Sequence, residues 1–104
     1  MELLTETLRE RFATIGDQSE ESDPLVIAAF FNPCARGVWF ATEYNPDTNH
    51  CFGYVSGLFP GGDEWGYFSI TELESLRLAF GLRIERNIHF VECRFSGLNI
   101  KENL

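Results

Sequence analysis

Residues 65–76 constrain the fold of this chain more than any other stretch. The aromatic residues 65–68 are typical of a short strand, because rings pack well on a pleated surface. Ser69 and, three residues later, Glu72 form a capping box, in which two side chains satisfy backbone N–H groups at a helix start. The sequence therefore predicts a strand that runs directly into a helix.

The predicted helix is amphipathic. Its apolar residues recur at helical spacing and are Ile70, Leu73, Leu76 and Phe80. Gly81 is suited to end the helix, since glycine readily adopts the left-handed conformation found there. A helix of this kind has to pack its apolar face back onto the sheet that precedes it, which favours the α+β class.

The N-terminal segment predicts another helix. Leu4, Leu8, Phe12 and Ile15 share one helical face, with Thr5 as the N-cap and Gly16 as the stop. Residues 17–23 that follow are acidic and poor in apolar side chains. We expect this acidic link to be mobile.

The remaining chain predicts strands over residues 25–31, 38–44, 50–57 and 88–95. Together with the strand at residues 65–68, they predict an antiparallel sheet of about four to five strands, packed by the N-terminal helix and the central capped helix. The chain has 104 residues, a length suited to one domain spanning residues 1–104.

Residues 45–49 predict a turn that would join two of these strands in a hairpin. In the simplest register Tyr44 faces His50, Phe40 faces Tyr54 and Trp39 faces Val55. One face then carries Val38, Phe40, Tyr44, Phe52 and Tyr54, and the other carries Trp39, Ala41, Gly53 and Val55. Both faces are apolar, so a face left uncovered would be a docking surface or a contact in a homodimer.

The charge of the chain is strongly negative and unevenly distributed. Sixteen acidic and eight basic residues give a net charge of −8, and no Lys or Arg lies between Arg36 and Arg77. Such a surface repels free nucleic acid and anionic membranes. The start resembles no signal peptide and no apolar run is long enough to span a bilayer, so we expect a soluble cytoplasmic protein.

Several motifs resemble those of a bacterial family. They are residues 41–47 (Ala-Thr-Glu-Tyr-Asn-Pro-Asp), Phe52-Gly53, residues 66–69 (Gly-Tyr-Phe-Ser) with Glu72-Leu73, and residues 81–90 (Gly-Leu-Arg-Ile-Glu-Arg-Asn-Ile-His-Phe). The resemblance covers about residues 3–98, and the chain departs from the family at Asn87, often aspartate there, and at Arg83, often proline.

The resembling family is a domain of unknown function, often carried on plasmids, conjugative elements and phages. The resemblance therefore implies a mobile-element setting and supplies no reaction and no catalytic residue. In such settings small acidic proteins frequently block host restriction or CRISPR effectors by occupying nucleic-acid channels.

On these grounds we expect a non-enzymatic interaction protein that docks an acidic, aromatic surface against a basic protein partner, with a host defence nuclease as the most concrete example. The predicted partner-binding residues come from the hairpin turn, its flanking strand, the loop at residues 59–64 and the start of the strand that follows this loop. They are Glu43, Asp47, Phe59, Asp63, Glu64 and Trp65. Complementary charge would speed association, and a buried ring would anchor the complex.

A second candidate recognition site lies in the basic C-terminal part. Arg83, Arg86 and His89 could bind carboxylates or phosphates, and the region from Arg77 to Arg94 would then serve a nucleic-acid-associated regulator. The alternative is internal: an arginine such as Arg86 pairs with an acidic neighbour (Glu43 or Glu72) and fixes the last strand to the sheet.

A third candidate is a small zinc protein or hydrolase. His50, Cys51, His89 and Cys93, with Cys34 in a loop, are residue types that bind zinc or act as nucleophiles. Their spacing argues against a metal site, because the adjacent His50 and Cys51 point to opposite faces of a strand. We therefore expect no cofactor and interpret the cysteines as reduced thiols in apolar surroundings.

Overall fold

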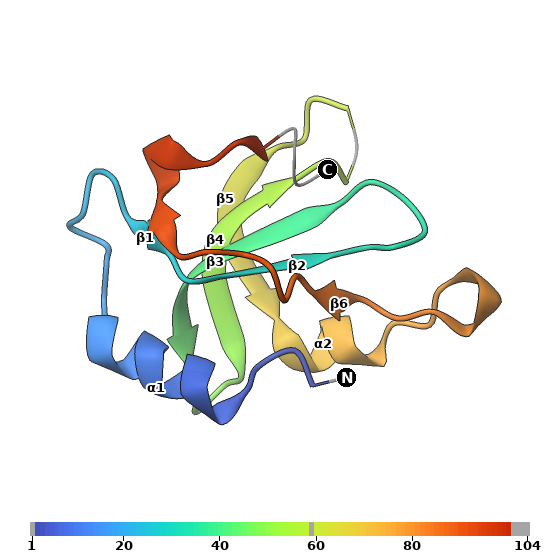
Figure 1. Cartoon of the computed structure of the whole chain (residues 1–104), viewed down its shortest axis with the longest axis horizontal. Helices are drawn as coiled ribbons and strands as arrows, with labels where there is room; N and C mark the ends of the chain where they lie inside the picture. Colours follow the sequence, from blue (N-terminus) through green and yellow to red (C-terminus); the bar gives the residue numbers. More distant parts are fainter. Residues whose placement is uncertain (1, 59, 101–104) are drawn as a thin grey trace.

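The protein is built on a five-stranded antiparallel sheet, and the two α-helices that the structure describes in full lie on one face of it (Figure 1). The computed structural model describes residues 2–58 and 60–100. In chain order the elements are α1 (Glu6–Ile15), β1 (Leu25–Val26), β2 (Ala28–Phe31), β3 (Val38–Asn45), β4 (His50–Ser56), β5 (Glu64–Ser69), α2 (Ile70–Ser75), a 3-10 turn (Ala79–Gly81), β6 (Glu85–Arg86), β7 (Cys93–Arg94) and a second 3-10 turn (Phe95–Gly97).

The strands are arranged in two sheets. The main sheet has the order β5-β4-β3-β2-β6, and β1 pairs separately with β7. All pairs are antiparallel. This architecture confirms the predicted α+β class. Among the described residues, no helix is both long enough and apolar enough to cross a bilayer.

The predicted helix starts are confirmed. The Ser69 hydroxyl accepts a hydrogen bond from the Glu72 N–H at 3.0 Å, so β5 turns directly into α2. At the start of α1, the Thr5 hydroxyl accepts from the Leu8 N–H at 3.1 Å, and Gly16 ends that helix with φ 70°. Local side-chain capping therefore acts as the sequence indicates.

The predicted extent of the central helix is wrong. Helix α2 ends at Ser75, and the side chain of Phe80 is 97% exposed rather than packed on the sheet. The guanidinium of Arg83 donates to the Glu74 carbonyl at 2.9 Å, which caps the end of the shortened helix. Beyond it the chain forms a loop in which Phe80 and Gly81 have positive φ, a conformation through which an α-helix cannot continue.

The predicted last strand over residues 88–95 is also wrong. The chain forms two short strands, β6 and β7, separated by a turn in which Asn87 accepts from the His89 N–H at 3.0 Å. An Asn side chain that bonds the backbone two residues ahead favours a turn over a continuous strand. The segment thus pairs first with β2 and then with β1.

The β3–β4 hairpin contains an irregularity that the sequence did not reveal. Phe40 faces Tyr54 and Trp39 faces Val55, as predicted, but the register shifts between Ala41 and Glu43. Tyr44 consequently faces Cys51 instead of His50. A bulge of this kind adds one residue to one strand and so exchanges the faces of the residues beyond it.

The bulge is stabilised by the acidic link, which was expected to be mobile. The buried side chain of Gln18 donates to the Thr42 carbonyl at 2.8 Å and to the Leu25 carbonyl at 2.9 Å, and it accepts from the Leu25 N–H at 2.7 Å. It therefore supplies partners for backbone groups at the irregular position. The link is anchored at this residue.

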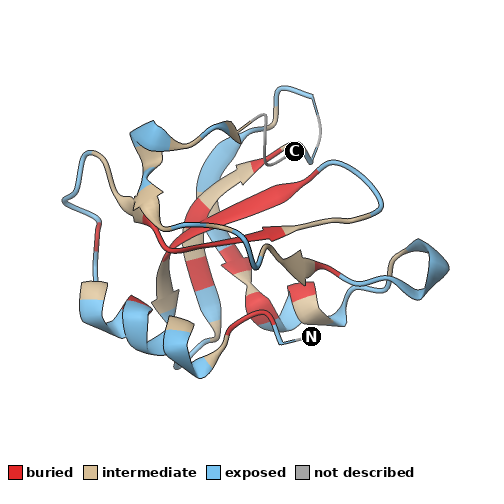
Figure 2. Cartoon of the chain, in the orientation of Figure 1, coloured by how far each residue is buried: buried red, intermediate tan, exposed pale blue. Residues whose placement is uncertain are grey.

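The two faces of the main sheet are covered differently. Helices α1 and α2 cover one face, hereafter the helix face, where the buried side chains include Leu4, Phe12, Phe30, Phe68, Ile70 and Leu73. The opposite face has a smaller cluster around Phe40, and residues 90–100 cover it without a long helix. Figure 2 shows burial concentrated in β2 and β3, whereas part of β5 is exposed.

Candidate functional site

The part of the opposite face that residues 90–100 leave uncovered forms a groove. Two adjoining hollows of about 580 and 590 Å³ share Asp17, Glu43, Phe52 and Tyr67 in their walls. We call this region the acidic aromatic groove and define it by Asp17, Glu21, Glu43, Phe52, Trp65 and Tyr67. The C-terminal end of α1 and the acidic link supply one wall, and strands β3, β4 and β5 supply the other.

The aromatic wall follows directly from strand pairing. Phe52 faces Tyr67 across β4 and β5, with ring centroids 4.9 Å apart, and it stacks on Trp65 at 6.0 Å. On the other side, Trp65 lies 4.7 Å from Phe95, a ring of the covering segment. The side chains of Trp65 and Tyr67 remain 39% and 79% exposed, so the row of rings offers apolar area to a ligand.

The acidic wall contains two carboxylates that influence each other. The bulge places Glu43 opposite Phe52, next to the rings. Partial burial raises the pKa of Glu43, and the negative charge of Asp17 raises it further. Hydrogen bonds from Ser19 lower the pKa of Asp17, so this carboxylate stays ionised. A positive ligand in the groove would relieve the repulsion between them.

Carboxylates beside exposed rings have a defined chemical preference. An Arg or Lys side chain gains a charge-assisted hydrogen bond from a carboxylate and a cation–π contact from a ring face. The sequence has no Lys or Arg between Arg36 and Arg77, the part of the chain that supplies Glu43 and all three rings of the groove. The groove therefore favours a cationic ligand and disfavours phosphate.

The structure distributes the predicted partner-binding residues over different places. Glu43 and Trp65 line the acidic aromatic groove. Asp47 lies in the β3–β4 turn, next to the first residue of β4. Asp63 and Glu64 lie at the start of β5, beside the last residues of β4 and therefore at the other end of that strand. These acidic residues therefore do not form one surface. Phe59 lies outside the described residues.

Asp63 has a local role in the β4–β5 connection. Its two carboxylate oxygens accept hydrogen bonds from the Ser56 hydroxyl at 2.8 Å and from the Gly57 N–H at 3.0 Å. These bonds lower the pKa of Asp63. Because both oxygens are used within the loop, Asp63 shapes the connection rather than one side of the groove.

Sequence reasoning missed four groove residues: Asp17, Glu21, Phe52 and Tyr67. The sequence did contain a pattern that indicates Phe52 and Tyr67. Phe52 and Tyr54 are two positions apart on one strand, as are Trp65 and Tyr67 on another, and this spacing predicts one aromatic face across both strands. The acidic pair had no such signal. Its members lie on the link at either side of Gln18, which is anchored beside the bulge.

The basic C-terminal candidates form internal contacts. Arg83 donates to the Glu74 carbonyl, and Arg86 donates to the Glu2 carbonyl at 2.7 Å and to the Leu3 carbonyl at 3.1 Å. Arg94 donates to the Asp23 carbonyl and lies 3.7 Å from a carboxylate oxygen of Glu21. These arginines tie the C-terminal segment to the rest of the chain, as in the internal interpretation, although these hydrogen bonds are to backbone carbonyls rather than to Glu43 or Glu72.

The zinc-type residues are placed apart. Cys51 is fully buried on the helix face, and burial raises its pKa to about 12. His50 and His89 are exposed on separate turns and strands, Cys34 is exposed in the loop after β2, and Cys93 is half-buried in β7. Among the residues that the structure describes, no three His, Cys, Asp or Glu side chains are grouped to hold a metal ion.

Comparison with known proteins finds one family. Residues 3–96 match the model of a family described as "Protein of unknown function (DUF2958)". No significant match exists among curated proteins or among solved structures. The match covers most of the chain and confirms the predicted resemblance to a domain of unknown function.

Proposed function

The chain belongs to the DUF2958 family, and on this premise we propose that it is a non-enzymatic protein–protein interaction module whose acidic aromatic groove binds a basic segment of a partner protein. The observation that supports this most directly is the meeting of Glu43 and Asp17 with the rings of Phe52, Trp65 and Tyr67 in one groove.

The groove has the properties of a recognition surface. Exposed aromatic side chains lose little conformational entropy on binding and commonly serve as anchors, while surrounding carboxylates set the sign of the partner. The net charge of −8 would also speed the approach of a basic protein.

We propose further that the partner is a host defence nuclease of the restriction or CRISPR type and that the protein serves a mobile genetic element. The support is the resemblance given above together with charge complementarity, because nucleic-acid channels of nucleases are lined by Lys and Arg. In this role the groove would accept basic side chains that otherwise bind phosphates.

The proposal is tested by titrating the full-length protein with a synthetic peptide, Gly-Arg-Gly-Arg-Gly, and following the tryptophan fluorescence, to which the buried Trp39 and the exposed groove residue Trp65 both contribute. We expect Glu43→Gln to weaken binding about tenfold, because it removes the half-buried carboxylate beside the rings. The matched control is Glu10→Gln, which removes the same charge from the exposed surface of α1 and should change the affinity less than twofold.

The acid dependence of the same titration gives an independent check. Because the pKa of Glu43 is raised, this carboxylate gains its proton at a higher pH than an ordinary glutamate as the solution is acidified. The affinity for the peptide should therefore fall as the pH is lowered from about 7 to about 4.5. The fall should be steeper for the unmodified protein than for Glu43→Gln, which has no carboxylate at this position. Equal affinities for Glu43→Gln and Glu10→Gln would contradict the assignment of the groove.

A further inference from the structure

Strand β5 is an edge of the main sheet, and it is long for an edge. It has six residues and pairs with β4 on one side, and no described strand lies on its other side. The opposite edge strand, β6, has only two residues. An exposed strand edge carries unpaired N–H and C=O groups that can pair with an added strand.

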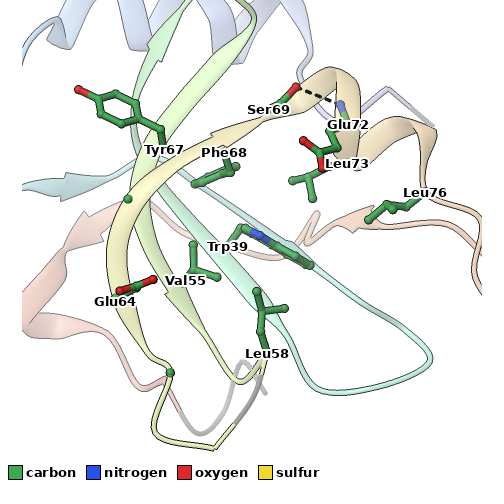
Figure 3. Close-up of a pocket in the computed structure, with 12 residues that line it drawn as sticks. Trp39, Val55, Leu58, Glu64, Tyr67, Phe68, Ser69, Glu72, Leu73 and Leu76 are labelled. Atoms are coloured by element: carbon green, nitrogen blue, oxygen red, sulfur yellow. Dashed lines mark hydrogen bonds between the residues drawn. The ribbon is translucent and has the colours of Figure 1, made fainter.

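An apolar cleft lies along this edge on the helix face. It has a volume of about 390 Å³, and its walls include Trp39, Val55, Leu58 and Leu76. Figure 3 shows Trp39, Val55 and Leu58 gathered on the side of β5 that also carries Phe68, while Tyr67 is turned away from them. Leu58 and Leu76 are 47% and 40% exposed, so part of this apolar surface is open to solvent.

The cleft is open because Gly66 carries no side chain. Residues 64, 66 and 68 alternate with Trp65 and Tyr67 along β5, so Gly66 faces the helix side between Glu64 and Phe68. A Cβ atom built at Gly66 has no other heavy atom within 4 Å, and its φ is not in the positive range. The space at this position is therefore available to a side chain from elsewhere.

The two faces of β5 differ in chemistry, and an added strand would contact both. Successive side chains of a strand point to opposite faces of the sheet. Those on one side would enter the apolar cleft, and those on the other would reach the acidic aromatic groove at Trp65 and Tyr67.

We propose that the partner contributes an extended strand with alternating apolar and basic residues, which pairs with the free edge of β5. The apolar residues occupy the cleft at Gly66, and the basic residues lie over the rings of Trp65 and Tyr67 at the β5 side of the acidic aromatic groove. This inference rests on the proposed function and specifies the conformation and sequence pattern of the basic segment.

Charge favours such a strand over a second copy of the chain. Glu64 and Glu72 line the cleft in addition to the carboxylates of the groove, and residues 37–76 contain no Lys or Arg. Pairing two copies through β5 would bring two molecules of net charge −8 together along these residues. A basic strand instead neutralises the charge on both sides of the edge.

The test uses the full-length protein and three synthetic peptides. The probe is an end-capped (Lys-Val)4 peptide, the first control is (Glu-Val)4, and the second is the Lys-Val peptide with one central valine replaced by proline. Amide hydrogen exchange and affinity are measured for each. We expect only the first peptide to bind, and we expect it to slow the exchange of amides in β5 at least tenfold.

The discriminating variant is Gly66→Leu, which fills the cleft from within and should weaken the binding of (Lys-Val)4 at least tenfold. Its matched control is Gly97→Leu, another position where a Cβ meets no atom within 4 Å, which should leave the affinity unchanged. Thermal unfolding of both variants shows whether either change perturbs the fold.

The outcomes separate this inference from the proposed function. Binding that is weakened by Glu43→Gln but not by Gly66→Leu, with unchanged exchange in β5, would overturn the strand pairing and leave the groove in place. If neither Glu43→Gln nor Gly66→Leu weakened peptide binding, both the strand pairing and the assignment of the groove would be overturned. Slow exchange in β5 without peptide, accompanied by a concentration-dependent dimer in sedimentation, would assign the edge to a second copy instead.

Discussion

The two faces of the main sheet have similar apolar composition but different cover. On the helix face, α1 and α2 bury Phe30 and Phe68 almost completely. On the opposite face, residues 90–100 cover Phe40 but leave Trp65 and Tyr67 partly or largely exposed. The same class of residue therefore serves the core on one face and remains available for binding on the other.

This difference follows from chain length and connectivity. Each α-helix is joined to the main sheet so that it packs on the same face, and the short segment after β6 is left to cover the other. A segment with only two-residue and three-residue elements covers less area than two helices. Trp65 and Tyr67 are thus exposed because both helices pack on one face and only a short segment packs on the other.

The largest expected effect is on the helix face. Replacing Phe30 by alanine removes a fully buried ring that contacts Phe68 edge-on at 6.4 Å. We expect the free energy of unfolding to fall by about 3–5 kcal/mol, as for other buried Phe residues. Urea unfolding followed by circular dichroism measures this value, and a loss below about 1 kcal/mol would show that the two faces do not differ as described.

A smaller effect is expected where the acidic link meets the bulge. Gln18→Ala leaves the Thr42 carbonyl and both backbone groups of Leu25 without their side-chain partner. We expect a loss of about 2 kcal/mol, measured by the same unfolding experiment.

The same variant should also affect the groove. Asp17 and Glu43 are held near each other by the Gln18 anchor, so peptide affinity should fall although Gln18 does not carry a charge. Unchanged affinity together with lost stability would show that the groove forms independently of this anchor.

The smallest effect on stability is expected at Tyr67. Its side chain is 79% exposed, so Tyr67→Ala should change the free energy of unfolding by no more than about 0.5 kcal/mol. The variant should nevertheless weaken binding of the Gly-Arg-Gly-Arg-Gly peptide, because it removes one ring of the groove. Tyr67→Phe is the control, since it keeps the ring and should retain the affinity.

The local features of the fold could be predicted from the sequence. The caps at Thr5 and Ser69 involve residues three positions apart, and the hairpin pairs Trp39–Val55 and Phe40–Tyr54 follow from a short turn between adjacent strands. Their energetics depend on neighbours along the chain, so the residue pattern contains the necessary information. The sequence predicts Glu43 and Trp65 as binding residues only because one is acidic and the other aromatic.

Only the tertiary structure decided how the candidate site is assembled. Helix α2 stops at Ser75, where the Arg83 guanidinium binds the Glu74 carbonyl, and the bulge at Thr42 depends on Gln18, which is 24 residues away in sequence. These features depend on long-range packing and on backbone groups that find distant partners, which no local pattern encodes. The sequence by itself determined the class of fold, its helix starts and its negative charge, whereas the cover over each face determined which aromatic rings remain open to a partner.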